Sequence, residues 1–76
     1  MNLFQYVNIN LIRIKSDVKN GLIPCSIIKY FAIYSRFDYY RKLGYNCSDS
    51  VFATSQDHNV NERTVFRIIK KMETEI

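Results

Sequence analysis

The sequence has only two glycines and one proline among its 76 residues, and it has no tryptophan. Disordered and low-complexity chains are rich in glycine, proline and polar residues, whereas 47% of these residues are hydrophobic. The composition is therefore that of a folded protein. A chain of this length has room for a single helical domain, residues 1–76, with a small core, because short domains bury only about 60% of the surface of the unfolded form.

Residues that commonly catalyse reactions or bind metals are also scarce. The chain has one histidine and two cysteines, and Cys25 and Cys47 lack the C-x-x-C spacing of zinc sites. There is no glycine-rich phosphate loop, no nucleophile with a histidine and an acid nearby, and no carboxylate pair on one helical face. We therefore expect no enzyme activity, metal or cofactor. The cysteines are expected to be reduced and to fill apolar space, with a single disulfide as the alternative.

No hydrophobic run approaches the roughly 20 residues needed to span a bilayer. The N-terminal apolar stretch has no basic segment before it, unlike a signal peptide, and Arg13 and Lys15 interrupt it. We therefore expect a soluble cytoplasmic protein with no membrane or small-molecule partner. The net charge of +4 favours polyanions, although many small basic domains bind neither nucleic acid nor acidic membranes.

The first predicted helix covers residues 3–18. Its apolar residues recur at alternating steps of three and four, as on one face of a helix: Phe4, Val7, Leu11, Ile14 and Val18. A strand through residues 8–15 is the alternative, but its alternation slips at Leu11 and Ile12, so a helix is favoured. Asn20 and Gly21 are suited to end this helix.

The second predicted helix runs from Pro24, which suits a first turn, to Leu43, and Gly44 ends it. Its apolar residues occupy a broad face and also the opposite side. The broad face holds Ile27, Ile28, Tyr30, Phe31, Tyr34 and Phe37, and the other side holds Ile33, Tyr40 and Leu43. Such a helix must be covered on more than one side, which predicts a central position in the fold or a contact between subunits.

Two shorter helices are predicted in the C-terminal part. Ser48 is suited to cap a helix that ends at about His58, with Asp49 in its first turn. Residues 59–61 interrupt the helical pattern, and Asn61 is suited to cap the last helix. The predicted fold is all-α, a small bundle of about four helices.

The last helix has two chemically different sides. Its apolar side consists of Val65, Ile68, Ile69 and Met72, and its basic side consists of Arg63, Arg67, Lys70 and Lys71. Periodicity alone fits a helix with a solvated basic side as well as it fits a nucleic-acid-binding helix.

Residues 49–72, DSVFATSQDHNVNERTVFRIIKKM, resemble the helix-turn-helix of small prokaryotic regulators, transposase and resolvase DNA-binding domains, and phage or mobile-element proteins. In that pattern Ser55 is the small residue where two helices cross, Asn59 is the left-handed turn residue, and Val60 is the apolar residue of the turn. The pattern prefers glycine where Asn59 stands and alanine where Ser55 stands, and both departures are mild. It prefers a large apolar residue where His58 stands, so His58 leaves the end of the first helix less well anchored.

The resemblance implies that the last helix is a recognition helix in the major groove of double-stranded DNA. The residues that it places toward DNA are Asn61, Glu62, Arg63, Thr64, Phe66, Arg67, Lys70 and Lys71. Arg63 and Arg67 are suited to guanine edges or phosphates, and the two lysines to phosphates. Phe66 either contacts a thymine methyl group or covers the margin of the core.

The resemblance implies a transcriptional regulator or an accessory factor of a mobile element. One recognition helix contacts few base pairs, so we expect a homodimer on two half-sites. The alternative function is a small protein interaction module whose basic helix binds an acidic partner protein.

Overall fold

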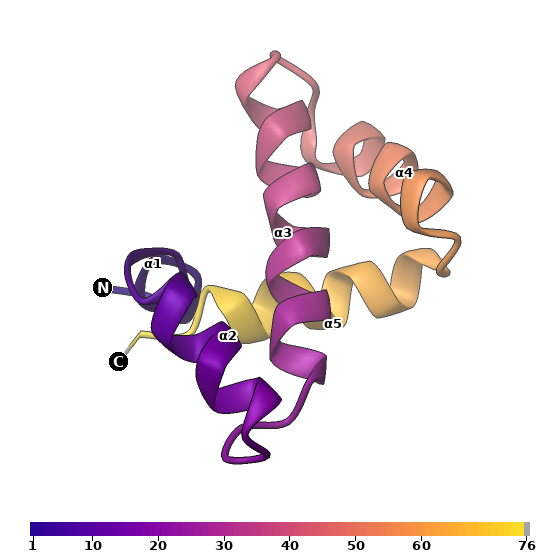
Figure 1. Cartoon of the computed structure of the whole chain (residues 1–76). Helices are drawn as coiled ribbons and strands as arrows, with labels where there is room; N and C mark the ends of the chain where they lie inside the picture. The colour runs from indigo at the N-terminus through magenta and orange to yellow at the C-terminus, as the bar shows by residue number, and fades with distance from the viewer. Residues whose placement is uncertain (76) are drawn as a thin grey trace.

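The computed structural model describes residues 1–75, and this part of the chain forms five α-helices and no strand (Figure 1). The helices are α1 (Leu3–Ile9), α2 (Leu11–Lys19), α3 (Ser26–Lys42), α4 (Cys47–His58) and α5 (Glu62–Met72). The all-α prediction is confirmed. None of the helices in the described residues has the length and apolar character that crossing a membrane requires.

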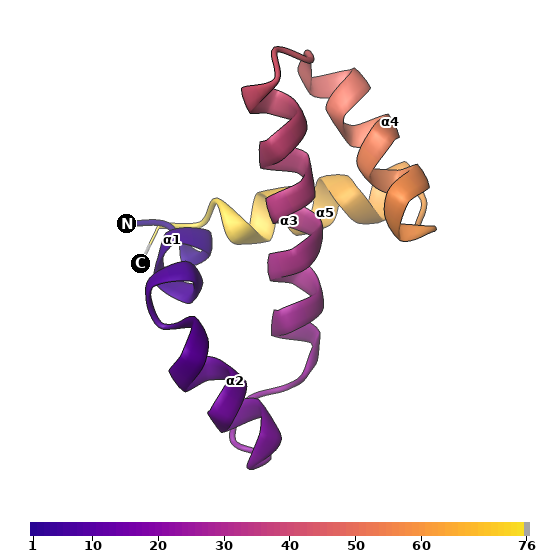
Figure 2. The same cartoon turned by 45° about the horizontal axis from the view of Figure 1, so that its top comes forward.

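Helix α3 is the central element, which is one of the two arrangements that its apolar residues predicted. It packs against α4 and α5, which also pack against each other, and against α1 (Figures 1 and 2). The core of the molecule lies among these helices, with one residue from α2, Ile14. It consists of Val7, Ile14, Ile33, Tyr34, Phe37, Val51, Val65, Ile68 and Met72. Most of the apolar surface of α3 is therefore covered within one chain, and the subunit contact that the sequence offered as an alternative is not needed to explain it.

The first predicted helix, residues 3–18, is two helices, α1 and α2, that meet at Asn10. The Asn10 side-chain amide donates a hydrogen bond to the Tyr6 carbonyl at 2.9 Å, alongside its own backbone N–H at 3.1 Å. Asparagine side chains compete in this way with regular helical bonding. The predicted apolar face is nevertheless correct, because Val7 and Ile14 are buried in the core.

Helices α3 and α4 begin at other residues than the sequence predicted. Pro24 lies ahead of α3 rather than in its first turn, and Cys25 is the N-cap. Asn46, not Ser48, caps α4, because its side-chain oxygen accepts the N–H of Asp49 at 2.8 Å.

The expectation that Cys25 and Cys47 fill apolar space is wrong. Both are exposed free thiols. The reason is their position, because each stands at the start of a helix, outside the core.

The turn between α4 and α5 depends on a left-handed residue, Asn59, with φ 53°. Side chains with a Cβ pay about 1–2 kcal/mol in this conformation, and glycine and asparagine tolerate it best.

We therefore expect Asn59→Ala to lower the free energy of unfolding by about 1 kcal/mol and Asn59→Gly to leave it within about 0.5 kcal/mol of the native value, measured by urea unfolding followed by circular dichroism. Asn20→Ala is the matched control, since Asn20 also ends a helix but has φ −87°. Equal stability of the two alanine variants would show that the turn does not depend on Asn59.

Candidate nucleic-acid interface

Helices α4 and α5 are joined by the turn Asn59–Asn61, in the arrangement that the sequence predicted. Ser55 is buried, and its carbonyl accepts the N–H of Val60 at 3.0 Å. Val60 packs against the core, as expected of the apolar residue of the turn. Asn61 caps α5, because its side-chain oxygen accepts the N–H of Thr64 at 2.8 Å.

The apolar side of α5 is fixed against the rest of the protein. Val65, Ile68 and Met72 are buried. Just after the last turn of α5, the hydroxyl of Tyr34 on α3 donates a hydrogen bond to the carboxylate of Glu73 at 2.9 Å. Burial, and then this bond to a carboxylate, raise the pKa of Tyr34 well above its ordinary value. The orientation of α5 is therefore set by packing along its length and by a hydrogen bond at its end.

The opposite side of α5 is exposed and basic. Arg63, Arg67 and Lys70 lie within about a sixth of the helix circumference, opposite the buried residues. No ion pair within residues 1–75 involves any of these three cations. We call these three residues the basic face of α5. Its cations are therefore not paired with carboxylates of the described chain.

Other predicted site residues lie around this basic face. Glu62 is exposed in the first turn of α5, and Thr64 is half-buried. The ammonium group of Lys71 lies 5.4 Å from the centre of the Tyr30 ring on α3, so Lys71 lies at the edge of the basic face that is nearer to α3. Asn61 uses its side-chain oxygen in capping, which leaves its amide NH₂ group as the donor for another partner.

Phe66 also lies beside the basic face. The residue is 49% exposed. A large part of its ring is therefore accessible to another molecule.

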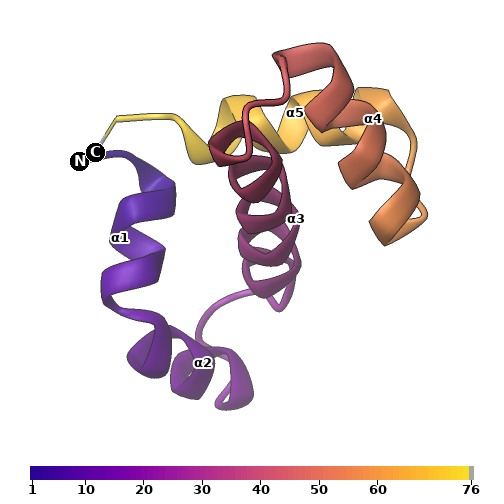
Figure 3. The ribbon, with the colours of Figure 1, turned by 90° about the horizontal axis from the view of Figure 1, so that it is seen from above.

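Helix α2 lies apart from α5. In the view from above, α5 and α2 are at opposite sides of the molecule, with α3 between them (Figure 3). Exposed cations of α2, such as Arg13 and Lys15, therefore do not extend the basic face of α5.

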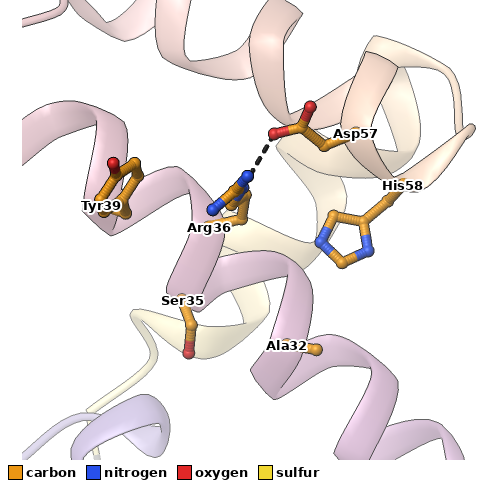
Figure 4. Close-up of a pocket in the computed structure, with 6 residues that line it drawn as sticks. All are labelled: Ala32, Ser35, Arg36, Tyr39, Asp57 and His58. Atoms are coloured by element: carbon orange, nitrogen blue, oxygen red, sulfur yellow. Dashed lines mark hydrogen bonds and ion pairs between the residues drawn. The ribbon is translucent and has the colours of Figure 1, made fainter.

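A hydrogen-bond network that the sequence did not predict joins α4 to α3. The guanidinium of Arg36 donates to the Asp57 carboxylate at 2.8 Å, and the Tyr40 hydroxyl donates to the same oxygen. Figure 4 shows Arg36 reaching from α3 toward Asp57, with the His58 ring beside them. His58 is half-buried and, together with Arg36 and Asp57, lines an open hollow of about 460 Å³. The partners are 17 and 21 residues apart in the sequence, and no local pattern signals them.

The hydrogen bond from Tyr40, and then that from Arg36, lower the pKa of Asp57 below its ordinary value near 3.8. A carboxyl group whose pKa is lowered by folding stabilises the folded state above its unfolded pKa, and this contribution is lost as the pH falls below that value toward the folded pKa.

We therefore expect Asp57→Asn to be less stable than the native protein at neutral pH and to approach it in stability below about pH 4. Urea unfolding midpoints from neutral pH down to about pH 2.5 measure this difference. Asp17→Asn is the control, because no ion pair within residues 1–75 involves Asp17. A difference between Asp57→Asn and the native protein that stays constant over the whole pH range would contradict the assigned role of the carboxylate.

The sequence matches no known family model, and comparisons with curated proteins and with solved structures find no significant match.

Proposed function

We propose that the protein binds double-stranded DNA, with α5 as a recognition helix in the major groove. The observation that carries this proposal is the basic face of α5, in which Arg63, Arg67 and Lys70 are exposed, without ion pairs among the described residues. The net charge of +4 is in keeping with a polyanionic partner.

The geometry of the helix pair supports the same proposal. An α-helix fits the width of the major groove, and a preceding helix joined by a tight turn is a common means of presenting it. In this chain α3 and α4 cover one side of α5 only, and the left-handed Asn59 starts the turn that redirects the chain from α4 into α5. The side of α5 that remains uncovered is the one that carries the cations.

The residues of α5 are suited to different contacts. Arg63 and Arg67 have the planar fork that binds guanine edges or phosphates with two parallel hydrogen bonds. Lys70 and Lys71 are suited to phosphates. Glu62 is not suited to a phosphate, but its carboxylate is suited to accept a hydrogen bond from the amino group of cytosine.

The proposal includes a second copy of the chain, because one recognition helix contacts few base pairs. Since most of α3 is covered, the large apolar side chains that remain exposed near its C-terminal end are those of Tyr39 and of the C-cap residue Leu43, at 49% and 57%. Light scattering during size-exclusion chromatography tests for the dimer, and a monomer at high concentration would contradict it. Transcriptional control and an accessory role in recombination both agree with this surface.

The experiment that tests the proposal is a fluorescence anisotropy titration of a mixed-sequence DNA duplex at several salt concentrations. Each phosphate contact contributes a slope of about −0.9 to a plot of log affinity against log salt, so contacts from the three cations of the basic face predict a slope steeper than about −2.5. A titration with polyglutamate under the same conditions tests the alternative, an acidic protein partner. Absence of duplex binding at low salt, with tight binding of polyglutamate, would reject DNA in favour of that alternative.

A further inference from the structure

We infer that Phe66 contacts the 5-methyl group of a thymine, so that the preferred DNA target of this protein has a thymine at a fixed position beside the bases or phosphates bound by the basic face. The inference depends on the proposed function, because it names what that same surface recognises. It adds a specificity-determining residue to a surface whose other members are charged or polar.

Phe66 lies on the same surface of α5 as the basic face. It follows Arg63 by three residues and precedes Lys70 by four, and residues with these separations are neighbours on a helix surface. A groove that receives Arg63 and Lys70 therefore also receives Phe66. Because Phe66 is 49% exposed, its ring has a large apolar surface available for contact.

The major groove offers one kind of apolar group that suits an aromatic ring. An aromatic ring cannot neutralise a phosphate. A contact between them would remove water from the phosphate without giving it a hydrogen bond in exchange. Among the base edges in the major groove, the 5-methyl group of thymine is the apolar group, whereas guanine, adenine and cytosine present hydrogen-bonding groups. Thymine is therefore the base that an exposed phenylalanine on this surface is suited to recognise.

The inference has a sharp test because deoxyuridine differs from thymidine by this methyl group alone. High-affinity duplexes are first selected from a random pool with the native protein. Each thymine of the selected site is then replaced in turn by deoxyuridine, and the affinity for each duplex is measured for the native protein and for Phe66→Ala. Phe52→Ala is the matched control, since Phe52 has a similar exposure of 54% but lies on α4, beside Asp49 and Tyr45.

We expect one thymine position at which deoxyuridine weakens binding of the native protein by about fourfold, the factor that corresponds to about 0.8 kcal/mol for one buried methyl group. Phe66→Ala should bind the thymidine and deoxyuridine duplexes equally well, while Phe52→Ala should keep the fourfold difference. Circular dichroism should show that both variants stay folded, because both side chains are about half exposed.

Three results would overturn the inference. They are a selected site without thymine, no loss of affinity at any deoxyuridine position, or a loss that persists in Phe66→Ala. In each of these cases the protein still binds DNA, so the proposed function is unaffected. A failure to enrich any duplex from the pool, by contrast, would reject the proposed function and the inference together.

Discussion

Replacing Arg63 and Arg67 together with alanine is expected to weaken binding to a selected duplex by about 150-fold, or roughly 3 kcal/mol. Both arginines are exposed on the basic face of α5 and lack ion pairs within residues 1–75, so the substitution breaks no salt bridge that the structure records. Loss of affinity would therefore report lost contacts with DNA rather than a damaged fold. Fluorescence anisotropy at constant salt measures the effect.

The control for this double variant is Arg13→Ala with Lys15→Ala, which also removes two positive charges, but from α2. Because α2 lies apart from α5 (Figure 3), this variant should lose only the few-fold affinity that a lower net charge costs. An equal loss in both variants would mean that overall charge, rather than the basic face of α5, determines binding.

The single variant Arg67→Ala separates two kinds of contact. If Arg67 contacts a base, its loss should cost about 1–3 kcal/mol and relax the sequence preference at one position. If it contacts a phosphate, all sequences should be weakened alike and the salt slope should fall by about 1. An unchanged affinity would contradict the proposed orientation of α5 in the groove.

The second large effect is expected in the core. Ile33 is completely buried at the middle of α3 and forms part of the core to which α5 also contributes. Removal of a buried isoleucine side chain beyond Cβ costs about 2–5 kcal/mol, because apolar contacts are lost and a cavity remains. Small domains have a total stability near the low end of about 5–15 kcal/mol, so Ile33→Ala is expected to be close to unfolding at room temperature.

Ile12→Ala is the matched control for Ile33→Ala, because it makes the same chemical change at a side chain that is 89% exposed. Its stability should stay within about 0.5 kcal/mol of the native value. Urea unfolding followed by circular dichroism compares the three proteins. Similar losses in both variants would contradict the placement of α3 at the centre of the core.

Local sequence signals predicted the part of the fold that positions the candidate site. The cap at Asn61, the left-handed Asn59 and the buried Val65 and Ile68 each depend on interactions within a few residues or on helical periodicity. These signals are strong because a cap or a left-handed turn admits few residue types. The exposed basic face of α5 follows from the same periodicity once the buried side is known.

Other features were missed because competing local bonds or distant partners determine them. The break at Asn10 arises from a side-chain hydrogen bond to Tyr6 inside an uninterrupted helical pattern. Asn46 and Ser48 are both good caps, and only the geometry of the loop decides between them.

Long-range polar contacts also had no sequence signal. The bonds of Asp57 with Arg36 and Tyr40, and that of Tyr34 with Glu73, join helices that are distant in the sequence. Near the ends of the described chain, the N–H of Leu3 donates to the carbonyl of Thr74 at 2.9 Å, which links the start of α1 to the segment after α5. Such pairs can be predicted only when the relative positions of the helices are known.

The measurement that tests the central proposal most directly is a titration of ¹⁵N-labelled protein with a selected duplex, followed by NMR chemical shifts of the backbone amides. We expect the largest shifts, and contacts to protons of the DNA, on residues 61–70, with smaller shifts on α2. Shifts centred on α2, or no shifts at a low salt concentration, would contradict the proposal that the basic face of α5 binds DNA.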